Sequence, residues 1–415
     1  MAESEKLQQL KESVLSGNIP QLVLSMISHA IDIRSSDIHI EPQKTRTKIR
    51  FRVDGVLREI IEYPLNLHPA VVSRIKIMSE LKIDEQRIPQ DGRTHVTTKD
   101  GREMDLRVST LPTVNGEKIV MRIQDKSKKI PDLPELGIEE TNFKYFQEAL
   151  ASPNGIILTT GPTGSGKTTT LYSSLSTLNK PEVNILTIED PVEIQMDGLN
   201  QSQVHPDINY TFAYGLRCAL RQDPNIIMVG EIRDRETADI AIEASLTGHL
   251  VLSTIHTNNA VETITRIVNL GIPNYLLAAT IELIIAQRLV RKLCPDCKKI
   301  VELTPDQKEH IEKVIEALPD AVKTANKDAV MKKQFYGPAG CEKCNNIGYL
   351  GRIGLYEMLR MNDEIRKLIL ENKLSIELEQ AASRSGMLNL ETDGVTKALK
   401  GITSIEEVYR VARKS

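Results

Sequence analysis

The chain of 415 residues contains no tryptophan, and aromatic side chains make up only 4% of it. Proteins that bind single-stranded nucleic acid stack bases on aromatic rings, so this scarcity argues against that class. Basic and acidic residues nearly cancel, at 53 and 56. The chain therefore offers no broad cationic surface to a polyanion. No run reaches the ~18 consecutive apolar residues of a membrane span, because polar and charged residues interrupt the richest run, 276–290.

Cysteine is also scarce, with five residues, and most of them occur in two C-x-x-C pairs. Such pairs are typical of a metal site in a reducing compartment rather than of a disulfide framework. The first residues, MAESEKLQQLKE, are polar and acidic, unlike a secretory signal peptide. We therefore expect a cytoplasmic protein whose length allows two or three domains.

Residues 161–170, GPTGSGKTTT, match the phosphate-loop pattern G-x-x-x-x-G-K-[ST]. A β-prone run (155–160) precedes them and a helical pattern (168–178) follows, which weakens the alternative of a Gly- and Thr-rich surface turn. Glycines let backbone N–H groups surround a phosphate, and the helix N-terminus adds partial positive charge. Lys167 is expected to reach the β- and γ-phosphates, and Thr168 to bind Mg²⁺. The predicted nucleotide-binding residues are Gly161, Pro162, Thr163, Gly164, Ser165, Gly166, Lys167, Thr168 and Thr169.

Two further β-prone runs, 183–188 and 226–229, each lead to a carboxylate, Glu189 and Glu231. The carboxyl ends of parallel strands meet at one edge of a sheet. A phosphate-loop enzyme needs carboxylates near Mg²⁺ and the attacking water. The alternative is that both groups only cap strand ends in water. We predict that both are catalytic.

Histidines flank the run 250–255. His256 lies at the predicted active edge, where it is either structural or a group that senses or orients the γ-phosphate. His249 lies at the opposite end of the run and is less suited to contact nucleotide.

Arginine is suited to bidentate phosphate recognition and to charge stabilisation in trans, although ordinary surface ion pairs are the alternative. Three arginines cluster around the second carboxylate: Arg217, Arg221 and Arg233. Others gather in the first part of the chain: Arg50, Arg52, Arg74, Arg93, Arg107 and Arg122.

The paired cysteines are Cys294, Cys297, Cys341 and Cys344. Four thiolates suit a closed, tetrahedral, structural zinc site. The gap between the pairs exceeds the ~15–20 residues common in zinc ribbons, which indicates an insertion with a helix around 305–317. A redox-active C-x-x-C is the alternative, but neither pair lies in a thioredoxin-like pattern.

The hydrophobic pattern divides the chain. An early helical stretch (21–33) and short alternating runs indicate an α+β domain, and a charged, proline-bearing segment follows it. Strands then alternate with helices, which is typical of a mostly parallel sheet. The predicted parts are an N-terminal α+β domain (1–124), a linker (125–137), a nucleotide-binding core (138–293), a zinc-binding module (294–344) and a C-terminal helical region (345–415).

Together these motifs resemble the secretion ATPase superfamily, the hexameric motors that assemble type IV pili and drive type II secretion. The likeness spans 20–415 and includes the phosphate loop. Its other motifs are SDIHIEP (36–42), RVDG (52–55), SRIKIM (73–78), PQDGR (89–93), ILTIEDPVE (185–193), LRQDPNIIMVGEIRD (220–234) and TGHLVLSTIHTN (247–258).

The resemblance implies an α/β fold with a PAS-like N-terminal domain and a RecA-like ATPase core that uses ATP, Mg²⁺ and Zn²⁺. In this family pattern Glu189 polarises the attacking water, and Glu231 supports Mg²⁺ and the water network. His256, and with less support His249, couples the γ-phosphate to interface geometry. The clustered arginines, with those of the first domain, stabilise charge between domains or subunits.

The resemblance also implies a hexamer that works on an inner-membrane platform protein, peripheral to the membrane and without nucleic acid. The four cysteines favour pilus assembly or type II secretion over pilus retraction. Family members often carry a further N-terminal domain, whereas only 1–19 precede the likeness here. The alternatives are a RecA-like nucleic-acid motor, another phosphate-loop enzyme such as a small-molecule kinase, and a non-catalytic nucleotide sensor.

Overall fold

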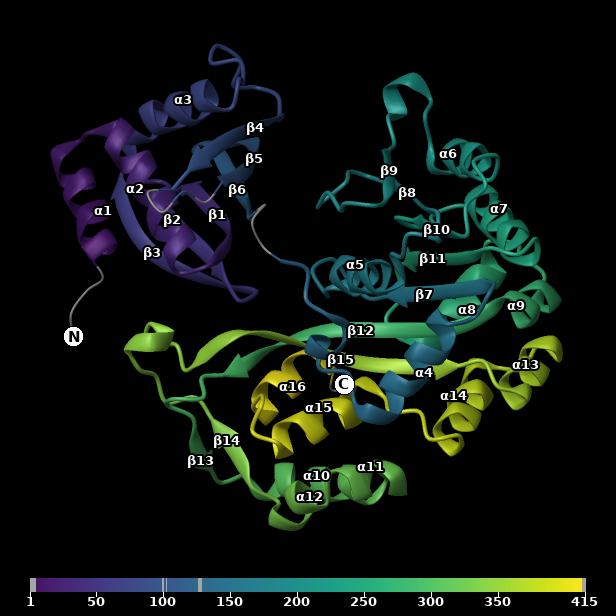
Figure 1. The fold of residues 1–415 in the computed structure, drawn as a ribbon. Helices are drawn as coiled ribbons and strands as arrows, with labels where there is room; N and C mark the ends of the chain where they lie inside the picture. The colour runs from purple at the N-terminus through teal and green to yellow at the C-terminus, as the bar shows by residue number, and fades with distance from the viewer. Residues whose placement is uncertain (1–4, 99–100, 102, 126–128, 413–415) are drawn as a thin grey trace. The chain divides into compact units, whose positions relative to one another are not determined.

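The computed structural model describes residues 5–98, 101, 103–125 and 129–412. They form two compact units, Met1–Lys129 and Ile130–Ser415 (Figure 1). The division falls inside the expected linker, of which 126–128 lie outside the described residues. None of the helices in the described part of the chain is long and apolar enough to cross a membrane.

The first unit is built on a six-stranded antiparallel sheet in the order β3-β2-β1-β6-β5-β4. Alternate side chains of β2, namely Ile49, Phe51 and Val53, are buried, as the period of a strand requires. The turn Asp54-Gly55 joins β2 to β3 with φ of 48° and 85°. Positive φ at both positions suits a two-residue hairpin. Helix α2 packs against β1 and α3.

The elements of this unit are α1 (Glu5–Ser16), α2 (Ile19–Asp32), β1 (Ser35–Pro42), β2 (Arg46–Val53), β3 (Val56–Pro64), α3 (His68–Met78), β4 (Gln90–Thr97), β5 (Glu103–Thr113) and β6 (Gly116–Asp125).

The second unit is built on a seven-stranded sheet in the order β15-β12-β7-β11-β10-β8-β9. All neighbouring strands are parallel except β15, which runs antiparallel to β12. Side chains of β7 alternate between two cores. Ile156 and Leu158 pack in the core that includes α7 and α8, whereas Ile157 packs with Leu171 of α5 and Phe146 of α4. Helices therefore cover both faces, as expected for an α/β sheet.

The strands of this sheet are β7 (Gly155–Thr160), β8 (Ile185–Glu189), β9 (Asn200–Gln203), β10 (Ile226–Val229), β11 (Leu250–Ile255), β12 (Ile281–Leu293) and β15 (Tyr349–Arg360). Its helices are α4 (Glu140–Leu150), α5 (Lys167–Leu178), α6 (Phe212–Ala219), α7 (Arg235–Leu246), α8 (Ala260–Asn269) and α9 (Asn274–Thr280). The strands predicted around 156–160, 183–188, 226–229 and 250–255 and the helix after the phosphate loop are confirmed.

Between the cysteine pairs, β13 (Lys299–Val301) and β14 (Phe335–Gly337) form a small sheet with three helices. These are α10 (Pro305–Glu316), α11 (Asp320–Ala325) and α12 (Lys327–Lys332), and α10 is the helix predicted around 305–317.

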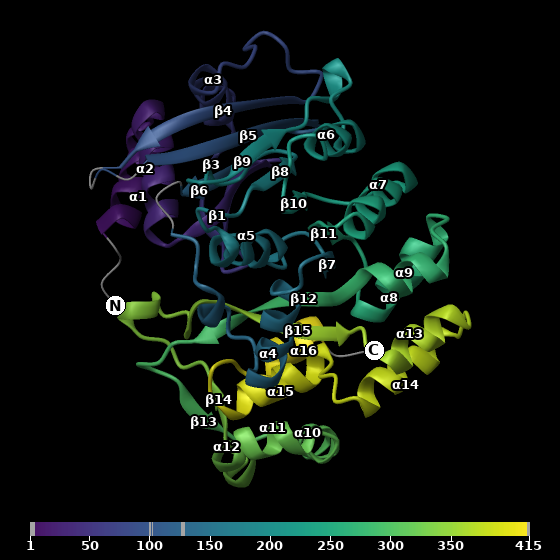
Figure 2. The ribbon, with the colours of Figure 1, turned by 45° about the vertical axis from the view of Figure 1, so that its right-hand side comes forward.

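The segment 345–415, expected to be helical, instead begins with the long strand β15, which joins the main sheet. Gly351 and Gly354 lower its helical propensity, and its partner β12 lies far back in the sequence. The helices that follow are α13 (Asp363–Leu370), α14 (Ser375–Arg384), α15 (Leu390–Leu399) and α16 (Ile405–Ala412). Figure 2 shows α13 and α14 beside α9 at one end of this unit.

Candidate active site

The phosphate loop joins β7 to α5, and its glycines are required by backbone angle and by space. Gly161 and Gly166 have φ of 142° and 94°, which L side chains rarely adopt. A Cβ atom at Gly161 would lie 2.5 Å from the carbonyl oxygen of Gln287, and one at Gly166 would lie 2.6 Å from Gln287 Nε2. The loop is therefore packed directly on β12. Because α5 begins at Lys167, the N–H groups of its first turn lack helical partners and can bind an anion.

Two side chains of the loop have contacts that suit a phosphate. Lys167 Nζ donates to the carbonyl oxygens of Gly161 (2.7 Å) and Pro162 (3.3 Å). Burial lowers the pKa of the Lys167 ammonium, and the Glu231 carboxylate opposes this shift. Ser165 is only 3% exposed, and its Oγ has no hydrogen-bond partner among the described residues. An unpaired buried hydroxyl is costly, so this atom fits a phosphate held by the loop.

The predicted carboxylates and His256 lie at the same edge of the sheet as the phosphate loop. In the parallel registers, Ile255 pairs with Thr160 and Val229 pairs with Ile188, so the strands end side by side. The residues at or just after these strand ends are Gly161, Glu189, Glu231 and His256. The structure therefore brings together groups that sequence reasoning placed at one edge.

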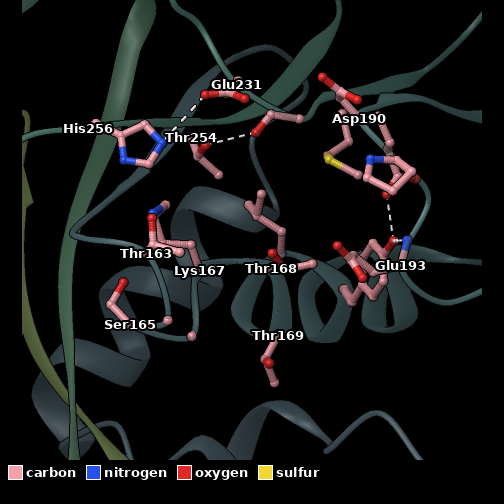
Figure 3. Close-up of a pocket in the computed structure, with 18 of the residues that line it drawn as sticks. Thr163, Ser165, Lys167, Thr168, Thr169, Asp190, Glu193, Glu231, Thr254 and His256 are labelled. Carbon is pink, nitrogen blue, oxygen red and sulfur yellow. Dashed lines mark hydrogen bonds and ion pairs between the residues drawn. The ribbon is translucent and has the colours of Figure 1, made fainter. Parts of the chain in front are cut away.

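Glu231 is held by two groups from different loops. Its carboxylate pairs with Arg233, whose pKa is raised by this hydrogen bond. Its Oε2 lies 3.4 Å from His256 Nε2. Figure 3 shows Glu231 and His256 facing each other above Lys167, and Thr168 between Lys167 and Glu193.

Glu189 has different surroundings, because its residue is only 4% exposed and its carboxylate accepts several hydrogen bonds. Tyr172 Oη donates to Oε2 at 2.5 Å. Thr187 Oγ1 and Gln201 Nε2 donate to Oε1 at 2.6 and 3.1 Å. The carboxylate is therefore fixed by side chains from α5, β8 and β9.

These groups line a pocket of about 500 Å³. The sequence predicted no role for several of its residues: Tyr172, Phe212, Thr254, Leu289 and Arg352. Leu289 and Arg352 come from β12 and β15, whose approach depends on sheet order and has no local signature. Tyr172 did carry a signal, because it lies four residues after Thr168 and thus on the same face of a helix.

The other predicted site residues take different places. Arg217 and Arg221, on and after α6, do not line this pocket: Arg217 pairs with Glu236, and Arg221 donates to the Arg217 carbonyl oxygen. His249 Nδ1 lies 2.8 Å from the carbonyl oxygen of Ala244, at the opposite edge of the sheet.

The first unit carries a row of arginines across three strands. Arg93, Arg107 and Arg122 are neighbours in the registers of β4, β5 and β6, and all three line a hollow of about 500 Å³. Arg122 Nε also lies 3.0 Å from the Asp37 carboxylate, which pairs with Arg52 as well. The hollow is therefore lined by three arginines, with Asp91 beside them.

The four predicted cysteines converge, with all four sulfur atoms within 4.8 Å of one another. The closest Sγ–Sγ distances are 3.8 Å for Cys294–Cys341, 3.8 Å for Cys297–Cys344 and 3.7 Å for Cys341–Cys344. A tetrahedron of sulfurs around zinc, with Zn–S bonds of ~2.3 Å, has edges of about 3.8 Å. Backbone N–H groups of Gly340 and Gly348 also point at these sulfurs. The donor set thus fits a tetrahedral metal ion.

The fold and pocket define a phosphate-loop nucleotide-binding protein of the α/β class. Comparison with known proteins narrows this class. Residues 12–410 match the family described as Type II/IV secretion system protein. The chain belongs to this family.

Relatives with closely similar sequences come from two kinds of machine. The type IV pilus assembly ATPase PilB of Myxococcus xanthus is 46% identical over 98% of this chain and 70% of its own length. The type II secretion system ATPase E of Vibrio cholerae is 46% identical over 98% of this chain and 78% of its own length. The relatives are thus longer than this chain.

Solved structures also resemble this one. The pilus retraction motor PilT with bound ADP is 27% identical, with a TM-score of 0.59 over 94% of this chain and 97% of PilT. The ATPase DotB of Legionella pneumophila shares the fold, with a TM-score of 0.65 at 23% identity over 93% of this chain and 94% of its own.

Proposed function

We propose that this chain hydrolyses ATP in the pocket at the edge of the main sheet and that hydrolysis drives assembly of a type IV pilus or of a type II secretion pseudopilus. The observation that carries the proposal is the convergence of the phosphate loop with Glu189, Glu231 and His256 in one pocket. The named relatives, which are ATPases of these two machines, support the same activity.

Each group in the pocket has a role that its geometry suits. The loop N–H groups and Ser165 would hold the phosphates, with Lys167 at the β- and γ-phosphates. Mg²⁺ would bind at Thr168 and stabilise charge on the phosphate oxygens. Glu231, between Arg233 and His256, would support the water network around that ion. Glu189 would polarise the attacking water.

The four cysteines would hold a zinc ion whose role is structural, because four thiolates leave no coordination position for water. The module contributes to one core with the C-terminal helices, since Ile311 and Ile315 of α10 pack with Val395 of α15 and Val408 of α16. A metal ion here would stabilise this packing.

We further propose that the second unit is RecA-like and the first unit PAS-like, and that six chains form a ring. The ring would act on a platform protein at the inner membrane, and the relatives' names place them in type IV pilus assembly and in type II secretion. Arginines of one chain would supply positive charge to the site of a neighbouring chain. The arginines proposed for this role are Arg217, Arg221 and the row Arg93, Arg107 and Arg122.

The test is Mg²⁺-dependent ATP hydrolysis by the purified chain and by Lys167→Ala. We expect the variant to lose about 100-fold or more of the activity, because the ammonium can no longer stabilise charge on the phosphates. Lys180→Ala is the matched control, since Lys180 is an exposed lysine just after α5. Normal hydrolysis by Lys167→Ala would overturn the assignment of the pocket.

A further inference from the structure

One tyrosine hydroxyl links α5, the helix that follows the phosphate loop, to the segment 189–194 at the end of β8. Tyr172 lies on α5, one turn after Thr168 and 1% exposed, with its ring in the core that includes Leu171 and Leu175. Its hydroxyl donates to Glu189 Oε2 at 2.5 Å and accepts the backbone N–H groups of Glu193 (3.2 Å) and Ile194 (3.4 Å).

The direction of this hydroxyl is fixed by its partners. A phenol has one proton and accepts through two lone pairs. Both N–H groups can only donate, so the proton of Tyr172 must point to the carboxylate of Glu189. Burial raises the pKa of Tyr172, and the Glu189 carboxylate raises it further, so the phenol stays protonated.

Among the residues that the structure describes, the donors to Glu189 leave its carboxylate one free acceptor position. Its two oxygens offer about four lone pairs in all. Thr187 and Gln201 take both lone pairs of Oε1, and Tyr172 takes one of Oε2. A water molecule can therefore be activated only through Oε2, the oxygen that Tyr172 holds. Rotation of the carboxylate would break all three bonds.

We propose that Tyr172 is a positioning residue for ATP hydrolysis: its hydroxyl orients Oε2 of Glu189, so that the helix that carries the phosphate loop also sets the direction of the base. The proposal rests on the catalytic role proposed above for Glu189. It assigns the reacting oxygen and makes the phosphate loop and the base parts of one hydrogen-bonded unit.

The test compares kcat, KM for ATP and the pH profile of kcat for the full chain and Tyr172→Phe, at a protein concentration where specific activity has levelled off. Phenylalanine keeps the buried ring and removes the hydroxyl. We expect kcat to fall about 10-fold, part of the ~10²–10⁴-fold that a positioned base supplies, while KM changes less than about 2-fold.

The acidic limb of the profile should also move to higher pH, because a carboxylate that loses a hydrogen-bond donor is protonated more easily. Other charged groups of the pocket stay the same in both proteins: Lys167, Asp190, Glu193, Glu231, Arg233, His256 and Arg352.

Tyr356→Phe is the matched control, because Tyr356 is 1% exposed, belongs to the same core and directs its hydroxyl to the Leu136 carbonyl oxygen. We expect it to keep wild-type kcat and the wild-type pH profile. Thr187→Val removes a donor to Oε1 while the bond from Tyr172 to Oε2 remains. If Oε2 is the reacting oxygen, kcat falls less in this variant than in Tyr172→Phe.

Wild-type kcat and pH profile in Tyr172→Phe, with Glu189→Gln inactive, would overturn the positioning role and leave the catalytic role of Glu189 in place. A normal kcat in Glu189→Gln would remove both. A raised KM and lowered melting temperature in Tyr172→Phe, without a shifted acidic limb, would show a purely structural role. Should Tyr172→Phe not fold, a larger loss of kcat in Thr187→Val than in Tyr356→Phe supports the ordered carboxylate, and no loss contradicts it.

Discussion

Two carboxylates lie at the active edge of the sheet, and their surroundings separate what each can do. Glu189 is buried and held by three neutral donors, so its position is rigid. Glu231 is 14% exposed in its side chain and pairs with Arg233 and with His256, which come from different loops. A bound phosphate or Mg²⁺ changes the charge beside such a pair directly. We therefore propose that Glu231 is the carboxylate whose contacts change when nucleotide binds.

Glu231→Gln keeps the shape of the side chain and removes its charge. We expect ATP binding to persist, because the loop N–H groups and Lys167 are unchanged, while hydrolysis falls at least about 100-fold. Binding is measured with ATP by equilibrium dialysis and turnover by phosphate release. Glu243→Gln on the exposed face of α7 is the control. Unchanged turnover in Glu231→Gln would demote this carboxylate to a structural role.

The predictable part of the site is the part that local sequence encodes. The phosphate loop, Glu189, Glu231 and His256 each follow a short apolar strand, and parallel strands end at a common edge. The missed part depends on how strands pair in the sheet, which has no local signature in the sequence. Gln201 reaches Glu189 from β9, and Leu289 and Arg352 enter the pocket from β12 and β15.

The same limit explains why the strand β15 was not predicted. Six consecutive residues of β15, 354–359, are buried. They are buried because β12 lies beside them. A short apolar run does not by itself distinguish a buried strand from a buried helix. The helices α13 and α14, which follow β15, have polar faces and lie in the region that was predicted to be helical.

Among the elements, β12 connects the two chemical features of the second unit. Gln287, in the middle of this strand, packs against Gly161 and Gly166 of the phosphate loop, and its Oε1 accepts from Thr170 of α5. The strand ends at Leu293, directly before Cys294. The cysteine module is therefore anchored at the end of the strand that supports the loop.

A metal ion in this module should be measurable without reference to activity. We expect about one zinc ion per chain by elemental analysis, because four thiolates match its tetrahedral preference. Cys297→Ser and Cys344→Ser should lose the metal and lower the melting temperature, since binding energy at a structural site contributes to folding. Cys218→Ser is the matched control, because Cys218 lies on α6, outside the cluster. Zinc-free wild-type protein with an unchanged melting temperature would instead indicate a redox or vacant site.

On the scale of the whole molecule, each unit has its own sheet, and the pocket groups named above all belong to the second. Of the arginines predicted to act on phosphate, Arg233 lines the pocket, and the others lie elsewhere. Arg217 on α6 and Arg221 just after it are exposed and lie outside the pocket, and the row Arg93, Arg107 and Arg122 belongs to the first unit. Exposed positions of this kind suit arginines that act on a neighbouring chain.

If neighbouring chains complete the site, specific activity must depend on association. We expect Mg²⁺-dependent ATP hydrolysis per chain to rise with protein concentration and to level off where sedimentation shows the oligomer. An arginine from a second chain stabilises charge on the transferring phosphoryl group only in the assembled state. Lys167→Ala at each concentration is the blank. Activity independent of concentration in a species that stays monomeric would mean a site complete within one chain, and the ring would then have no part in the chemistry.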